Sequence, residues 1–201
     1  MFDLLLKPKF YSKCKSALRI NKVRLETIKK KRNAVENFLK KDIADLLKND
    51  LDYNAYGRAE GLTIEQNQTA CYKFIEQFSL CISMHVSIMQ KQSECPEECR
   101  EAIASLIYAA ARFADLPELR TLRALFTKKY GNSLEPYLNR EFVEKLQAEP
   151  PTKEMKLQLM HAIAREFSIE WDSKALEQTL FKPPPSEQYK ALHKSWARMK
   201  Q

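Results

Sequence analysis

Residues 10–48 read FYSKCKSALRINKVRLETIKKKRNAVENFLKKDIADLLK and contain neither proline nor glycine. Positions three and four residues apart share one face of an α-helix, and a helix of about forty residues is about 60 Å long. The polar Asn21 and Arg32 interrupt the apolar stripe, so we expect this face to pair with a partner that answers them. The stripe comprises Phe10, Cys14, Leu18, Asn21, Leu25, Ile28, Arg32, Val35, Leu39 and Leu46.

A second long helix is predicted over residues 53–92, after a break at residues 49–52. Two long helices joined by so short a loop should form an antiparallel hairpin. Gly57 and Gly61 each cost about 1 kcal/mol relative to alanine in a helix, so we expect close backbone approach to compensate. The predicted apolar side comprises Tyr56, Ala70, Phe74, Phe78, Ile82, His85 and either Ile88 or Met89.

Shorter helices are predicted in the remainder, and only three glycines occur in 201 residues, which disfavours a strand-rich fold. We therefore predict an all-α fold with a helical core over residues 1–182. Prolines 183–185 form a stiff linker to an amphipathic helix within 183–201, which either docks on the core or is offered to a partner. The shorter core helices are expected at about 96–113, 118–130, 138–148, 152–167 and 172–180.

Positive charge is concentrated at the start of the chain. Residues 1–41 hold thirteen Lys or Arg against three acidic residues, a net charge of +10, whereas the whole chain carries +8. Such a block attracts anionic lipid or nucleic acid, or is a solvated face. The basic face has no interleaved aromatic residues and no nucleic-acid motif, so we predict no nucleic-acid binding. The candidate contact residues are Lys13, Lys15, Arg19, Lys22, Lys30 and Lys41.

Signs of catalysis or a cofactor are missing from the sequence. The three histidines lie far apart, and no Gly-rich phosphate loop, HExxH or nucleophile elbow occurs. Cys95 and Cys99 have a spacing that suits two zinc ligands, yet no second Cys/His pair completes a tetrahedral set. We therefore expect free thiols in a reducing compartment, no metal, no cofactor and no enzymatic activity. We expect His85 to be a core or interface residue. No apolar run of eighteen residues and no signal peptide is found.

A series of collinear motifs resembles the increased-sodium-tolerance family, ESCRT-III-related regulators of the Vps-type AAA ATPase. The resemblance covers roughly residues 10–172. Its motifs are DIADLL (42–47), AYGRAEGL (55–62), AIASLIYAAARF (102–113), DLPEL (115–119), KYG (129–131), LQAEPPT (146–152) and IAREFSIEW (163–171). It implies an ESCRT-III-like fold, in which a long two-helix hairpin carries shorter packed helices. Arg58 and Glu60 match the hairpin signature, whereas Gly61 stands where the family commonly has a larger residue.

The resemblance also implies a function and partners. It indicates a cytoplasmic, non-catalytic scaffold and regulator, peripheral at endosomal membranes, in multivesicular body sorting and membrane scission. Implied partners are the C-terminal helix of a charged multivesicular body protein, an anionic membrane and further copies of the chain. The AAA ATPase and its Vta-type activator would bind through MIT-interacting motifs in a tail beyond a core fragment such as this one. Within the chain, Leu192, Trp196, Met199 and Lys200 imitate such a motif in part, with Ser195 in place of its arginine.

A second interpretation is a pure protein-interaction adaptor. In it the basic face binds acidic protein segments, such as the acidic C-terminal regions of ESCRT subunits, without touching a membrane. Binding of this kind should be sensitive to salt.

Overall fold

The computed structural model describes residues 9–182, and this part of the chain is built from α-helices and two short 3₁₀ helices with no β-strand. The predicted all-α class is therefore confirmed. The chain divides into two compact units, Met1–Leu39 with Gly61–Pro150, and Lys40–Glu60 with Pro151–Gln201. Both long helices contribute to each unit. The predicted linker and final helix in 183–201 lie outside the described residues, so that domain boundary stays a prediction.

The two long helices have nearly the predicted bounds, α1 at Lys9–Lys48 and α2 at Asp52–Lys91. The turn between them is a helix-ending Schellman motif. Asp50 takes a left-handed φ of 56°, while the Leu51 amide donates to Leu46 O and the Asp50 amide to Leu47 O. The Asn49 side chain adds a bond to Asp45 O at 2.7 Å. These bonds satisfy carbonyls that the end of α1 would otherwise leave unpaired.

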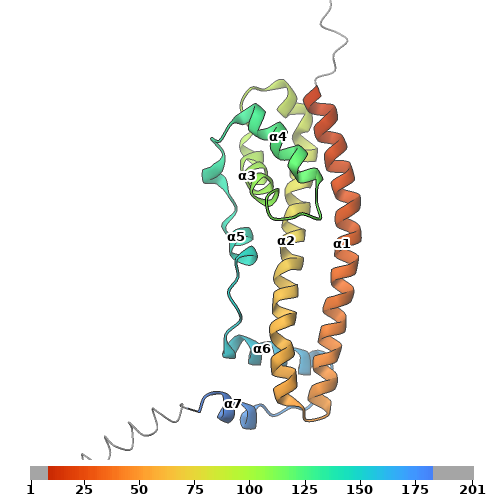
Figure 1. The fold of residues 1–201 in the computed structure, drawn as a ribbon, viewed down its shortest axis with the longest axis vertical. Helices are drawn as coiled ribbons and strands as arrows, with labels where there is room; N and C mark the ends of the chain where they lie inside the picture. Colours follow the sequence, from red (N-terminus) through yellow and green to blue (C-terminus); the bar gives the residue numbers. More distant parts are fainter. Residues whose placement is uncertain (1–8, 183–201) are drawn as a thin grey trace, which may run out of the picture. The chain divides into compact units, whose positions relative to one another are not determined.

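In the first unit α1 and α2 run side by side in opposite directions (Figure 1). Asn21 is fully buried and its Nδ2 donates to Ser79 Oγ at 3.2 Å. Arg32 Nη1 donates to Glu65 Oε1 at 2.9 Å, and its guanidinium lies 4.8 Å from the centre of the Tyr72 ring. The expectation that both polar residues of the stripe have partners is confirmed.

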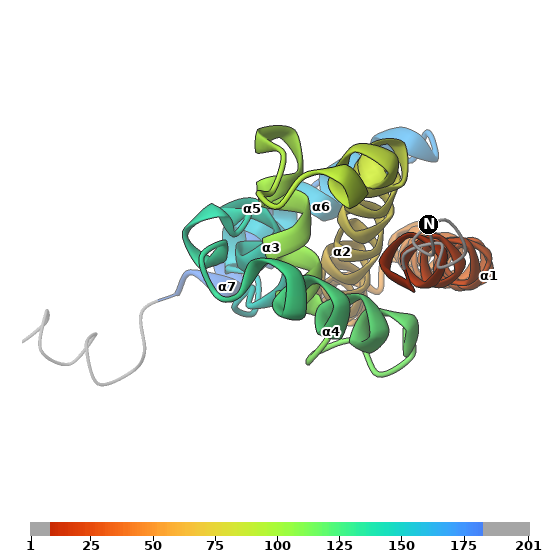
Figure 2. The same cartoon turned by 90° about the horizontal axis from the view of Figure 1, so that it is seen from above.

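Three further α-helices complete the first unit: α3 (Arg100–Ala109), α4 (Glu118–Tyr130) and α5 (Arg140–Leu146). Figure 2 shows α3 and α4 beside the long helices. Phe142 of α5 is fully buried and its ring meets four others, those of Phe74, Phe78, Tyr108 and Phe113, at centroid distances of 5.7–6.3 Å. Asn139 caps α5 by accepting the Phe142 amide hydrogen bond.

The third helix differs from the prediction at both of its ends. Residues 97–99 form a 3₁₀ turn, and α3 itself ends at Ala109 rather than near Phe113. The Arg112 amide bonds Ala109 O three residues back, which tightens the chain into the turn that precedes α4.

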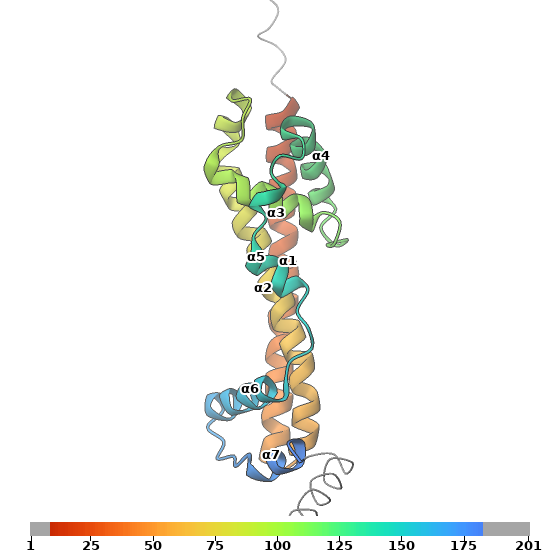
Figure 3. The same cartoon turned by 90° about the vertical axis from the view of Figure 1, so that its left-hand side faces the viewer.

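The second unit consists of the hairpin end, α6 (Lys153–Glu166) and α7 (Lys174–Leu180). Figure 3 shows α6 crossing the hairpin end rather than running along it. The Thr152 hydroxyl accepts from the Met155 amide and caps α6. Trp171 Nε1 donates to Asp52 Oδ1 at 3.0 Å. Buried apolar residues of this unit include Ile43, Ala44, Leu47, Ala55, Ala59, Leu157, Met160 and Ile163.

Two details of the predicted packing are wrong. Val35 is 45% exposed, because at 3.6 residues per turn the inward position after Arg32 falls at Glu36, which is half-buried. Gly57 and Gly61 do not mark a close backbone approach, since an added Cβ would have no heavy atom within 4 Å at either position. Of the alternatives left open on α2, Met89 is the buried residue and Ile88 the exposed one.

An ion pair also joins α1 to α4. Arg24 donates two hydrogen bonds to Glu118 in the first turn of α4, Nε to Oε2 at 3.0 Å and Nη2 to Oε1 at 2.9 Å. These bonds lower the pKa of the Glu118 carboxyl below its ordinary value of 4.5. The carboxylate also lies at the positive end of the α4 dipole, which favours its charge.

Replacing the two α2 glycines should stabilise the protein. Gly57→Ala and Gly61→Ala are each expected to raise the free energy of unfolding by up to about 1 kcal/mol, because each removes the conformational cost of a helical glycine without a clash. Urea unfolding measures the change. Gly131→Ala is the matched control and should destabilise, because Gly131 has φ +66°. Destabilisation by Gly61→Ala would contradict the open surroundings described above.

The Glu118 pair should make stability depend on pH. Because its folded pKa is lowered, the unfolded chain binds more protons in the acidic range, and this contribution is present at pH 7 and lost as the pH falls through the folded pKa. Glu118→Gln should therefore destabilise at pH 7 and converge with wild type in urea unfolding only as the pH falls below the lowered folded pKa of Glu118. Glu144→Gln, at an exposed acid, serves as the control. An equal loss at both pH values would exclude the ion pair as the cause.

Candidate functional site

The outward face of α1 carries most of the predicted contact residues. Steps of four and three residues place four exposed cations in one line, the basic row, which comprises Lys15, Arg19, Lys22 and Lys30. Glu26 is the one acidic residue in that line. Within residues 9–182 no member of the row forms an ion pair, and Lys15 Nζ donates to Tyr11 Oη at 3.0 Å. The row therefore presents uncompensated positive charge to solvent.

Three other basic residues of α1 form ion pairs inside the first unit. Arg24 pairs with Glu118 at 2.9 Å, Lys29 with Glu76 at 2.5 Å, and Arg32 with Glu65 at 2.9 Å. Burial lowers the pKa of Arg32, but its bonds to Tyr72 and Glu65 outweigh that effect and raise it, so the guanidinium stays charged. The sequence identified Arg32 as an inward position that needs a partner, but it did not show that Arg24 and Lys29 are paired.

An exposed apolar row, which the sequence analysis missed, runs beside the basic row. It comprises Ile20, Val23 and Phe38, whose exposed fractions are 45%, 60% and 69%. The sequence contains a second three- and four-residue periodicity that corresponds to this row, and Lys31 is its one charged member. It runs through positions 20, 23, 27, 31, 34 and 38. Ile20 and Val23 also line a groove of about 680 Å³ that reaches Asp115, whose carboxylate accepts from Tyr72 Oη at 2.5 Å.

Lys13 belongs to a different surface from the basic row. It lines a groove of about 770 Å³ between the start of α1 and α4, whose apolar lining includes Phe10 and Leu125. Lys129 Nζ lies 5.2 Å from the centre of the Phe10 ring. We call this the basic groove, because four of its lining residues are cations: Lys13, Arg120, Lys128 and Lys129.

The remaining predicted positions lie in the second unit. Lys41 is exposed on α1. Arg58 Nε lies 3.1 Å from Asp42 Oδ2, and Glu60 Oε2 accepts from Lys156 Nζ at 2.6 Å. The hairpin signature residues Arg58 and Glu60 thus form ion pairs with α1 and α6 within this unit. The candidate MIT-interacting residues Leu192, Trp196, Met199 and Lys200 lie outside the described residues.

No helix in the described part of the chain is long and apolar enough to cross a membrane. The first unit thus has three exposed features that are candidates for binding: a charged row, an apolar row beside it and a cation-lined groove.

Comparisons with known proteins bear on the fold and on the family. An IST1-like protein from Dictyostelium discoideum is 25% identical over 167 residues, which is 79% of this chain and 45% of that protein. The chain thus spans less than half the length of this curated relative. The crystal structure of the S. cerevisiae Ist1 N-terminal domain in complex with a Did2 MIM motif has a TM-score of 0.73 at 20% identity, over 84% of this chain and 97% of that one.

The fold is accordingly that of the Ist1 N-terminal domain, an ESCRT-III-like helical fold. Residues 15–170 match the family described as "Ist1: Regulator of Vps4 activity in the MVB pathway", where MVB denotes the multivesicular body. The matched segment contains the basic row, the inward ion pairs and the hairpin signature. The chain belongs to the Ist1 family.

Proposed function

We propose that this chain is a non-catalytic scaffold that regulates the Vps4 AAA ATPase in multivesicular body sorting and membrane scission. The observation that carries the proposal is the outward face of α1 in a chain of the Ist1 family, where a basic row and an apolar row lie side by side. The scaffold works peripherally at endosomal membranes from the cytoplasmic side, where it can assemble with further copies of itself.

The α1 surface suits an anionic membrane in two ways. Each Lys or Arg near anionic lipid contributes about 1 kcal/mol to membrane binding, and the basic row supplies four such cations. Helices that lie in the membrane interface also bury an apolar face among the acyl chains. Val23 and Phe38 are the most exposed members of the apolar row and supply that face.

The basic groove suits a partner helix. The relative from S. cerevisiae was crystallised with a Did2 MIM motif, and we propose that this chain likewise binds the C-terminal helix of a charged multivesicular body protein. An amphipathic helix binds by laying its apolar face in a hydrophobic groove. Phe10 and Leu125 provide the apolar lining, while Lys13, Arg120 and Lys128 complement acidic residues on the partner.

Recruitment of the ATPase and of its Vta-type activator would require MIT-interacting motifs. Leu192, Trp196, Met199 and Lys200 match such a motif only in part, with Ser195 in place of its arginine. We therefore expect this chain alone to recruit the ATPase weakly.

A pure adaptor is the second candidate function, and the basic groove favours it. In that case acidic protein segments occupy both the groove and the basic row, and no membrane is involved. The apolar row discriminates between the two functions, because adaptor binding through charge alone does not need Val23 or Phe38.

Liposome flotation tests the membrane arm. Reversal of the basic row to glutamate, at Lys15, Arg19, Lys22 and Lys30, should reduce binding to anionic vesicles at least a hundredfold, since each cation contributes about 1 kcal/mol. The uncharged double variant Val23→Ser/Phe38→Ser should also weaken flotation while leaving its salt dependence unchanged.

The matched control reverses four exposed cations elsewhere in the first unit and should retain most binding: Lys73, Lys91, Arg140 and Lys145. Equal flotation of wild type and the basic-row variant would eliminate the membrane arm. If the Val23/Phe38 variant binds vesicles like wild type, insertion of the apolar row is excluded.

Peptide titration tests the groove. Leu125→Asp and Lys128→Glu should each weaken the binding of a charged-multivesicular-body-protein C-terminal peptide at least tenfold, because one introduces a carboxylate among the apolar lining residues and the other places like charges together. Isothermal calorimetry measures the affinity, and circular dichroism checks folding. Lys73→Glu is the control on α2. Unchanged affinity in both groove variants would place the peptide elsewhere.

A further inference from the structure

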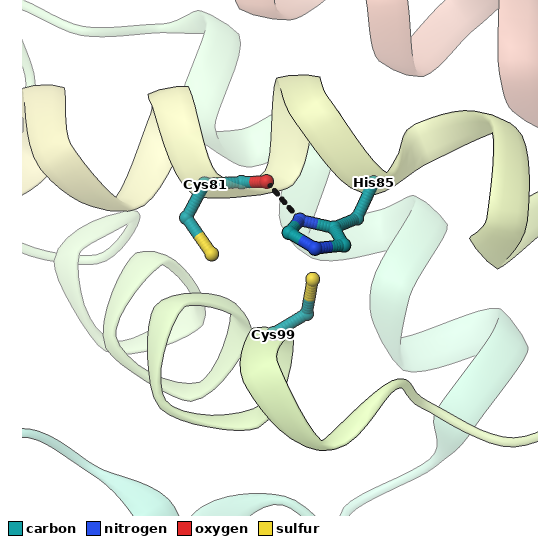
Figure 4. A group of neighbouring side chains, drawn as sticks. All are labelled: Cys81, His85 and Cys99. Carbon is teal, nitrogen blue, oxygen red and sulfur yellow. Dashed lines mark hydrogen bonds between the residues drawn. The ribbon is translucent and has the colours of Figure 1, made fainter.

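Three metal-ligating side chains meet where the end of α2 faces the start of α3. Cys81 and His85 lie on successive turns of α2, and Cys99 ends the 3₁₀ turn at Glu97–Cys99 (Figure 4). Their ligand atoms all lie within 4.8 Å of one another. Cys99 is buried, whereas Cys81 and His85 are partly accessible, so an ion could reach the cluster from solvent.

The cluster adds the ligands that the sequence pattern alone did not reveal. In the sequence only Cys95 and Cys99 have a spacing that suits zinc, with no second Cys/His pair beside them. The structure places Cys81 and His85 beside Cys99, which gives the order Cys-x₃-His followed by Cys-x₃-Cys. Residues four apart lie on the same face of a helix, so α2 presents Cys81 and His85 together.

Hydrogen bonding prepares His85 for coordination. Its Nδ1 lies 2.8 Å from the Cys81 carbonyl oxygen, which only accepts, so Nδ1 carries the proton. Nε2 then holds a free lone pair, and Figure 4 shows this nitrogen on the side of the ring toward the Cys99 sulfur. A bond from the other ring nitrogen to a backbone carbonyl is the usual support of metal-bound histidine.

We propose that Cys81, His85 and Cys99 bind a zinc ion. In this step Zn²⁺ displaces the thiol protons of Cys81 and Cys99, two protons leave to solvent, and two Zn–S bonds and one Zn–N bond form. Zn–S bonds of about 2.3 Å and Zn–N bonds of about 2.0–2.1 Å place tetrahedral ligand atoms about 3.5–3.8 Å apart. The ligand atoms therefore need to approach one another by at most about 1.0–1.3 Å, which side-chain rotation can supply.

Cys95 is the candidate for the fourth ligand. It lies four residues before Cys99 on a half-buried loop, and its thiol donates to the Pro96 carbonyl at 3.4 Å.

The ion would fasten the end of α2 to the beginning of α3. At that junction the Cys81 thiol already donates to the Glu98 carbonyl, at 3.3 Å. A metal that binds the folded chain and not the unfolded one stabilises the fold.

The test uses the full 201-residue chain, reduced and freed of metal by a chelator. Native mass spectrometry should show one Zn²⁺ per chain, zinc should raise the melting temperature, and Co²⁺ should give the visible absorption of a tetrahedral thiolate site. Cys81→Ser and His85→Gln should each weaken zinc binding by more than the roughly 10–100-fold that the loss of a supporting residue costs. Cys95→Ser should weaken it less, because water can take the fourth position.

Cys71→Ser is the matched control, since Cys71 is a buried free thiol on the same helix outside the cluster. It should bind zinc like wild type, and circular dichroism confirms that each variant is folded. The proposal is overturned if wild type binds Zn²⁺ no more tightly than folded Cys81→Ser or His85→Gln, or if Cys71→Ser lowers the affinity as much as they do.

Discussion

The ion pair between Arg32 and Glu65 shows the constraint on which the first unit depends. A long helix so rich in lysine and arginine can pair with a second helix only if the cations facing inward meet anions. Glu65 and Glu76 on α2 meet this requirement, and Glu118 on α4 pairs with the exposed Arg24. Each pairing joins residues far apart in sequence, so together they hold α1 in one register.

The same constraint decides which charges remain for function. Arg24, Lys29 and Arg32 are neutralised within the unit, whereas the cations of the basic row have no such partner in the described chain. The excess charge seen in the sequence is therefore divided by the packing into a structural part and a surface part. Only the surface part can attract an anionic membrane or an acidic protein.

Features set by local periodicity could be predicted from the sequence. The bounds of α1 and α2, the turn between them and the need for partners at Asn21 and Arg32 all follow from the spacing of apolar residues. The family resemblance rested on motifs distributed along the same helices, and the family match over residues 15–170 confirms it.

Features set by contacts between distant segments could not be predicted. Nothing local to Lys29 identifies Glu76 as its partner. Cys81 and His85 form a cluster of metal-ligating side chains only because the turn at residues 97–99 brings Cys99 beside them. The exposed apolar row was detectable in the sequence, but α1 has several overlapping periodicities. Burial, known only from the structure, shows which of them faces the core.

Three sides of α1 have different roles, and two of them are exposed and can bind a partner. One side of the helix is committed to α2 and α4, a second side presents the basic row, and a third presents the apolar row. Charge and apolar area lie along the same solvent-exposed length of α1. A flat, extended partner can engage both rows at once, whereas a small substrate would contact only a few residues of either. We therefore propose that the partner of α1 is an extended anionic surface rather than a compact ligand.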